Sequence, residues 1–294
     1  MTGTVDAHHH IWRQINLPWL MGPMQPRIFG PYEAIRRDYL IDEYLDDIKT
    51  AGIEKSVYVQ ANWAVDRFED EVAWVQSVAD LAGWPHGIVG YVDLLQADAR
   101  GDLERLRQYP LMRGVRQQLH WHDNEMYRFA SSPEQVSDPT LQRNIARLAD
   151  YGWSFDLQVF APQMKAAATL AASCPDVTFV LQHAGMLEDV TEAGQARWQD
   201  GMQRLAAQPN VVCKLSGLGT FIHRNNPDHI KNITLQAVAW FGVERCLFGS
   251  NFPIEKLWTG YGPLIDAYRQ ALSDLDQRAA QAIFADTATR VYRL

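Results

Sequence analysis

Short runs rich in β-branched and aromatic residues alternate along the whole chain with longer stretches of helical periodicity. Eight runs are typical of strands: residues 4–8, 55–60, 87–93, 113–118, 154–159, 178–183, 211–216 and 245–250. Strands separated by helices pair in parallel, because a parallel connection needs a crossover. Eight strand–helix units close a barrel, and a chain of 294 residues is long enough to form one. We therefore expect an α/β fold, a (β/α)8 TIM barrel, as a single domain over residues 1–294.

Helices are expected between these strands and after the last one. Their periodic stretches cover residues 41–51, 68–82, 98–109, 138–151, 162–174, 195–208, 227–241, 263–272 and 277–284. Gly52, Gly152 and Gly242 each follow such a stretch, at a position where a helix often needs a residue with positive φ. The alternative fold is an open, doubly wound sheet. No G-x-G-x-x-G follows the first expected strand, which disfavours that alternative.

Two long irregular segments, residues 13–37 and 120–137, interrupt the pattern. In a barrel they would follow strands one and four at the catalytic end, where long loops often act as lids or binding loops. Aromatic residues in the expected loops would suit an apolar wall around a substrate ring, although ordinary loop packing explains each one equally well. These aromatics are Trp19, Trp63, Trp121, Tyr127 and Trp258.

Charge and composition indicate which classes of protein and of binding partner are expected. The net charge is −8 and 47% of residues are hydrophobic, which favours a soluble globular protein and argues against nucleic acid. Three widely separated cysteines form no C-x-x-C pair, which is typical of a cytoplasmic protein. No targeting segment and no membrane span is expected.

Histidines end two of the expected strands. In Asp6-Ala7-His8-His9-His10, alternation along a strand would point His8 and His10 the same way, so that both imidazoles can bind one divalent ion. The other readings are a chance run or a tag remnant. His183 ends the apolar run Leu181-Gln182-His183 and could be a third ligand or a proton donor; alone it would more often be structural.

Other polar residues interrupt or follow apolar strands. Lys214 would face the barrel interior or form a structural ion pair. Arg116 is expected to face inward, where it could clamp a carboxylate or polarise a carbonyl, unless it pairs with Asp156. Asn251 follows the eighth strand, and Glu255 is the nearest downstream carboxylate.

Taken in order, these motifs resemble the amidohydrolase superfamily, and most closely its amidohydrolase-2 group, which includes sugar-acid lactonases and the pyrone-dicarboxylate lactonase. The resemblance extends over nearly the whole chain. It rests on Asp6-Ala7-His8-His9-His10-Ile11-Trp12, Tyr58-Val59-Gln60-Ala61, Gly114-Val115-Arg116, Gln182-His183-Ala184-Gly185, Cys213-Lys214-Leu215-Ser216-Gly217 and Phe248-Gly249-Ser250-Asn251-Phe252-Pro253. The eighth strand of that family normally supplies an aspartate, and this sequence has Asn251 in its place.

The resemblance implies roles for particular residues. The metal ligands would be His8, His10 and His183. The catalytic residues would be His183, Asn251, Arg116 and Lys214. The substrate would be bound by Gln60, Trp63, Arg116, Trp121 and Glu255. The implied cofactor is a divalent ion, zinc or manganese, which is dispensable in some lactonases of the group. Without it, His183 or Glu255 would act as base, and the strand-end position favours His183.

We therefore expect a hydrolase that opens a small lactone ring by water attack at the barrel mouth. Its partner would be a small molecule, and assembly into a homo-oligomer stays open. Two alternatives remain: a metal-dependent decarboxylase or hydratase on the same scaffold, and a non-catalytic binding protein that has lost the base.

Overall fold

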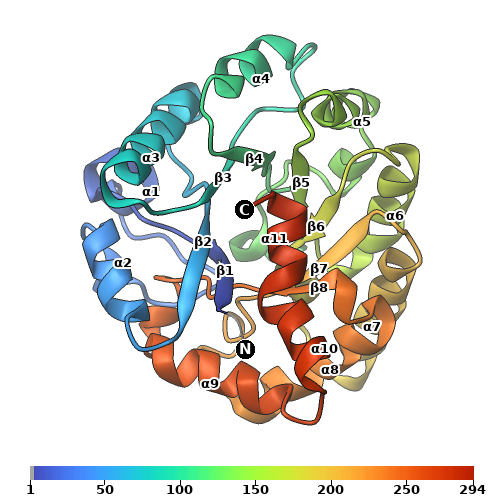
Figure 1. Ribbon diagram of the computed structural model, residues 1–294. Helices are drawn as coiled ribbons and strands as arrows, with labels where there is room; N and C mark the ends of the chain where they lie inside the picture. The colour runs from blue at the N-terminus through green and yellow to red at the C-terminus, as the bar shows by residue number, and fades with distance from the viewer. Residues whose placement is uncertain (1–2) are drawn as a thin grey trace.

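In the computed structural model, which describes residues 3–294, eight parallel strands follow one another in sequence order around a barrel (Figure 1). The strands are β1 Thr4–His9, β2 Ile53–Val59, β3 Gly87–Gly90, β4 Met112–Val115, β5 Ser154–Leu157, β6 Phe179–Leu181, β7 Val211–Leu215 and β8 Cys246–Phe248. All eight expected strands are confirmed. The ring closes where the His10 amide donates to Phe252 O at 2.7 Å and the Asn251 amide donates to His8 O at 2.7 Å. This closure rules out the open-sheet alternative.

Alternating side chains divide the strands between two cores. Small and β-branched residues such as Val57, Val89, Val180 and Val212 fill the barrel interior. The opposite faces of the strands pack against the surrounding helices in a larger core. Filling by branched side chains makes the interior a packed core rather than a pore, so a ligand has room only at an end.

The helices form the outer layer. They are α1 Pro18–Met21, α2 Ile41–Ile48, α3 Phe68–Ala82, α4 Arg100–Arg107, α5 Pro139–Ala146, α6 Met164–Ser173, α7 Glu192–Ala206, α8 Pro227–Phe241, α9 Tyr261–Ala271, α10 Gln277–Gln281 and α11 Thr287–Tyr292. The helix expected over 138–151 ends at Ala146 and continues as a 3-10 turn, Arg147–Tyr151, before Gly152 at φ 64°. The last expected helix extends beyond residue 284 through a π turn, Ala282–Asp286, into α11.

Helix α11, red in Figure 1, lies across one end of the barrel. Its residues Ala288, Val291 and Tyr292 belong to the interior core. A Cβ on Gly87, the first residue of β3, would lie 3.1 Å from Leu294, so the chain terminus sits at the amino ends of the strands. Ligands must therefore enter from the carboxyl ends, where segments 13–37 and 120–137 follow β1 and β4 as expected. Across residues 3–294, the helices fall short of the length and apolar character that a membrane crossing requires.

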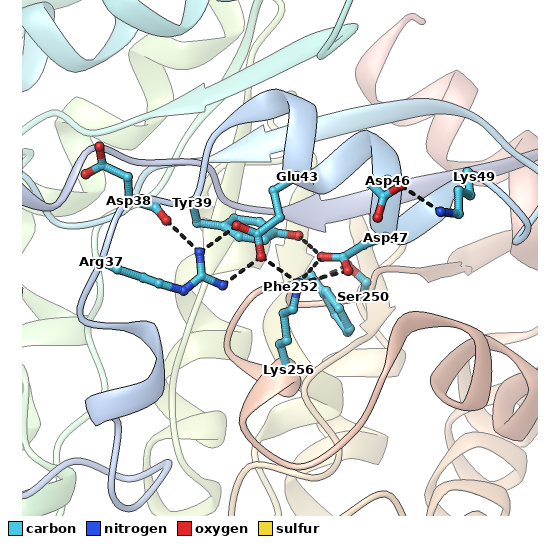
Figure 2. A network of polar contacts seen from close by, with 10 residues as sticks. All are labelled: Arg37, Asp38, Tyr39, Glu43, Asp46, Asp47, Lys49, Ser250, Phe252 and Lys256. Carbon is cyan, nitrogen blue, oxygen red and sulfur yellow. Dashed lines mark hydrogen bonds and ion pairs between the residues drawn. The ribbon is translucent and has the colours of Figure 1, made fainter.

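A polar network fastens the loop after β8 to α2 (Figure 2). Lys256 Nζ lies 2.7 Å from both Glu43 and Asp47, and Arg37 pairs with Glu43 at 2.5 Å. Tyr39 donates to Asp47 at 2.7 Å. Single exposed ion pairs contribute little, but several that share carboxylates hold a loop more firmly. The segment that carries Asn251 is thereby fixed beside β1.

Candidate active site

A bulge in β1 separates Asp6 from His8 and His10. Asp6 pairs with Ser56 and His9 with Tyr58, so an advance of three residues along β1 lies opposite an advance of two residues along β2. In consequence His9 turns outward and stacks on Tyr44 of α2 at a ring-centroid distance of 3.9 Å. Plain alternation would have placed Asp6 on the same side as His8; the bulge reverses that.

Asp6 anchors the outer side of this strand. Its carboxylate accepts hydrogen bonds from Tyr44 Oη at 3.0 Å, Tyr261 Oη at 2.9 Å and Ser250 Oγ at 2.6 Å. Because these donors come from α2, α9 and the end of β8, Asp6 locks β1 into the barrel closure. His8 and His10 then lie together on the inner side, with ring centroids 5.0 Å apart, as the sequence predicts.

A cavity of about 390 Å³ opens at the carboxyl ends of the strands. Five of the residues expected in the site line it: His10, Trp63, Arg116, His183 and Asn251. His8 lies just beneath, fully buried, with its ring centroid 4.9 Å from that of His183. The first and later halves of the chain therefore bring their histidines to one place.

His183 is held in a strained backbone at the end of β6. Its φ is 53°, and left-handed conformations continue through Ala184, Gly185 and Met186. Non-glycine residues in this region cost of order 1–3 kcal/mol, and such strain concentrates at functional sites. Ser216 Oγ lies 2.9 Å from His183 Nδ1, so the other ring nitrogen, Nε2, is left for a ligand.

Glycines in two of the sequence motifs make room for the histidines. A Cβ on Gly217, at φ 60°, would lie 2.6 Å from His183 Nδ1. A Cβ on Gly249 would lie 2.7 Å from the Cβ of His8. Real Cβ contacts are not this short, so each ring sits where only glycine allows it.

Lys214 faces the barrel interior and is also ion-paired. Its Nζ lies 2.8 Å from Asp156 Oδ2, and both side chains are completely inaccessible to solvent. Tyr292 of α11 and Gln182 also donate to the Asp156 carboxylate, at 3.1 and 2.8 Å. Arg116 forms no such pair and instead donates to Gln60 O while it lines the cavity. Its guanidinium and that of Arg27 both line the cavity, so either can meet a ligand.

Burial and neighbouring cations keep the imidazoles neutral. Desolvation, with Lys214 and Arg116 nearby, lowers the pKa of His8 and that of His183 far below the ordinary value. Desolvation also lowers the pKa of His10 to about 3, an effect that Arg116 reinforces and the Asn251 side chain opposes. A neutral imidazole offers a lone pair, which suits either a proton acceptor or a metal ligand.

A family model described as amidohydrolase matches residues 5–294, almost the entire chain. The chain belongs to the amidohydrolase family. The Sinorhizobium fredii protein y4mH is 35% identical to it over 292 residues, which is 99% of this chain and 98% of that one. L-fucono-1,5-lactonase of Burkholderia multivorans is 29% identical in an alignment of 303 positions, gaps included, that covers 99% of this chain and 96% of the lactonase.

Solved structures agree with this assignment. An amidohydrolase of Burkholderia multivorans, solved with bound zinc, is 28% identical and superposes with a TM-score of 0.83 over 99% of each chain. A probable 2-pyrone-4,6-dicarboxylic acid hydrolase of Acinetobacter baumannii has a TM-score of 0.76 over 100% of each chain. At 16% identity this second likeness supports the fold alone.

In this amidohydrolase, the ring spacing within two pairs of histidines fits the binding of a divalent ion. Both ring nitrogens of His8 are buried and have no hydrogen-bond partner within the described part of the chain. Two imidazoles on one tetrahedral zinc, at about 2.0–2.1 Å each, place their ring centroids about 5 Å apart. That is the spacing of His8 to His10 and of His8 to His183.

The expectation that His8, His10 and His183 bind one ion stays a prediction. Among residues 3–294, no three His, Cys, Asp or Glu side chains are grouped as a metal site. His8 lies close to each of the other two, while His10 Nδ1 bonds to Val59 O and His183 Nδ1 to Ser216 Oγ. Asn251 brings a neutral amide to the cavity, which adds no anionic ligand.

Three residues expected to bind substrate do not line the cavity. Gln60 faces a smaller adjoining pocket, where its Oε1 accepts from the Asn62 amide at 2.7 Å. Trp121 lies outside, with the Arg128 guanidinium 4.9 Å from its ring. Glu255 is 1% exposed and accepts from Trp258 Nε1 at 2.8 Å.

Burial raises the pKa of Glu255 to about 8, while contacts with Trp258 and Asn251 act in the opposite direction. Glu255 is not among the residues that line the cavity. Position therefore favours His183, which lines the cavity, as the proton acceptor.

The structure also adds wall residues that sequence reasoning missed. They are Arg27, Asn62, Gln118, Phe129, Gln158 and Phe221, among others. Gln118 and Gln158 end two of the expected strands, and strand-end position is the signal that could have identified them. No sequence signal separates Arg27 from the other arginines, because a folded loop brings it to the cavity.

Proposed function

We propose that this amidohydrolase opens a small lactone ring by hydrolysis. One observation carries the proposal: neutral imidazoles and the Arg116 guanidinium converge on one cavity at the carboxyl rim of the barrel. Support comes from two relatives named L-fucono-1,5-lactonase, at 27% and 29% identity, which this chain matches over nearly its full length.

Each group has a part in the proposed reaction. Arg116 donates to the carbonyl oxygen of the ring ester, where negative charge develops as water attacks. His183 Nε2 accepts the proton of that water, while Ser216 holds Nδ1 and fixes the ring orientation. The tetrahedral intermediate collapses as the ring C–O bond breaks, and the proton passes to the leaving alkoxide. The product is an open-chain hydroxy carboxylic acid, which ionises near neutral pH and releases the second proton of the water.

Where a divalent ion is bound, His8 together with His10 or His183 would hold it. The ion would polarise the carbonyl and lower the pKa of a water molecule. Asn251 would then orient the water through its amide, because it cannot take up a proton.

A substrate panel tests the proposal. Purified protein is mixed near neutral pH with L-fucono-1,5-lactone, other sugar lactones and 2-pyrone-4,6-dicarboxylate, and proton release is followed. Turnover of a lactone supports the proposal. Release of carbon dioxide from carboxylated aromatics instead would indicate a decarboxylase. Ligand binding without turnover of any compound in the panel would indicate a non-catalytic binding protein.

Asn251→Asp is expected to raise zinc affinity by about 10-fold or more, since it places a carboxylate beside His10 and His8. Affinity is measured by competition with a zinc indicator. The matched control is Asn62→Asp, at a cavity-lining asparagine that also has positive φ. An equal gain in both variants would mean that added negative charge attracts zinc without a defined ligand position. No gain at residue 251 would place the ion elsewhere.

A further inference from the structure

We infer that Gln118 and Gln158 form a recognition subsite for ring hydroxyl groups of the substrate, on the cavity wall at the ends of β4 and β5. The inference rests on the proposed lactone hydrolysis and adds which lactones are accepted. Nothing in the reaction itself uses these two amides.

Unpaired buried polar atoms mark this wall. Gln158 is 3% exposed and lines the cavity, and its Oε1 has no hydrogen-bond partner in residues 3–294. Gln118 Oε1 and Trp63 Nε1, both in cavity-lining side chains, likewise lack partners within the described chain. Buried polar atoms are nearly always hydrogen-bonded, so atoms left unpaired at a cavity are matched by what enters it.

Strand order places the two glutamines beside Arg116 and His183 and across the barrel from His10 and Asn251. Gln118 follows β4 and Gln158 follows β5, whereas His10 and Asn251 follow β1 and β8. In a ring of eight sequential strands, β4 and β5 lie opposite β8 and β1. A ring whose ester carbonyl meets Arg116 and His183 therefore has the two glutamines beside it, since all four residues follow the adjacent strands β4, β5 and β6.

Hydroxyl groups match this wall best. An amide offers both donors and an acceptor, and a hydroxyl donates and accepts at the same time. A carboxylate accepts only, so two amide oxygens would be left unpaired against it. Aromatic residues Trp19, Phe29 and Phe221 form other parts of the lining and suit the C–H face of such a ring. The chemical class is a neutral, polyhydroxylated lactone.

The test compares D-glucono-1,5-lactone with δ-valerolactone, the same ring without hydroxyls. Each kcat/KM is divided by the uncatalysed rate, which removes intrinsic reactivity. We expect the wild type to prefer the hydroxylated ring by about 100-fold or more, because a site that hydrogen-bonds hydroxyls rejects an analogue lacking them. Gln158→Met should reduce that preference by about 10-fold or more, mainly through KM. Gln199→Met on α7 is the matched control and should leave the preference intact.

A binding measurement separates this inference from the proposed function. 1,5-Anhydro-D-glucitol has the hydroxylated ring but no ester, and its binding to wild type and Gln158→Met is compared by calorimetry. Binding that weakens in the variant supports the subsite even if no lactone is turned over. Lactone turnover with no hydroxyl preference would overturn the subsite and leave the hydrolase intact. Absence of both turnover and binding would overturn both.

Discussion

Replacing His183 by alanine is expected to lower kcat for the best lactone by about 10²–10⁴-fold without unfolding the protein. A positioned proton acceptor contributes this much to a reaction that needs the attacking water deprotonated. The side chain projects into the cavity from the end of β6 and bonds to Ser216, so its loss empties part of the site and removes little of the packed core. Steady-state kinetics and circular dichroism measure both parts of the expectation.

The matched control is His86→Ala. His86 is half-buried and precedes β3, at the barrel end opposite the cavity, so the same deletion there should leave kcat unchanged. If His183→Ala retains near-normal turnover while its fold is intact, the proton acceptor has been misassigned. If both variants lose activity equally, the loss reflects general destabilisation rather than chemistry.

Residues at strand ends could be predicted from the sequence because alternation and order determine them. Eight strand–helix units imply the barrel, and the barrel brings His10, Arg116, His183 and Asn251 to one rim. None of this requires knowledge of a loop conformation. The convergence of residues far apart in the chain follows from topology alone.

Features that depend on local irregularity could not be predicted in this way. The β1 bulge decides that Asp6 faces the helices while His8 faces inward, and strict alternation gives the opposite result for one of them. Trp121 resembles other loop aromatics, yet its loop carries it outside the cavity. The bulge and the loop path are set by tertiary contacts, such as the tyrosines that bind Asp6.

For Lys214 the sequence leaves two roles open, one in catalysis and one in a structural ion pair. Its ammonium group pairs with Asp156 at 2.8 Å in the barrel interior, beneath His8 and His183, whose pKa values it helps to lower. Tyr292 of α11 completes the same cluster. A lysine in this position stabilises the packed layer beneath the site and adds positive charge below the imidazoles.

Lys214→Met is therefore expected to destabilise the protein by about 3–5 kcal/mol, because it leaves the Asp156 carboxylate buried without its cation. Urea unfolding measures the loss. Lys165→Met, at an exposed lysine of α6, is the matched control and should change stability by no more than about 0.5 kcal/mol. A loss below about 1 kcal/mol in Lys214→Met would show that Asp156 does not depend on this partner.

The double variant Lys214→Met/Asp156→Leu separates structure from catalysis. Replacing both charges by apolar groups of similar size is often neutral for stability, so the double variant should recover most of the loss. If it also recovers turnover, Lys214 serves the fold alone. If stability returns while kcat stays low, the buried Lys214–Asp156 pair beneath His8 and His183 contributes to the reaction as well as to the fold.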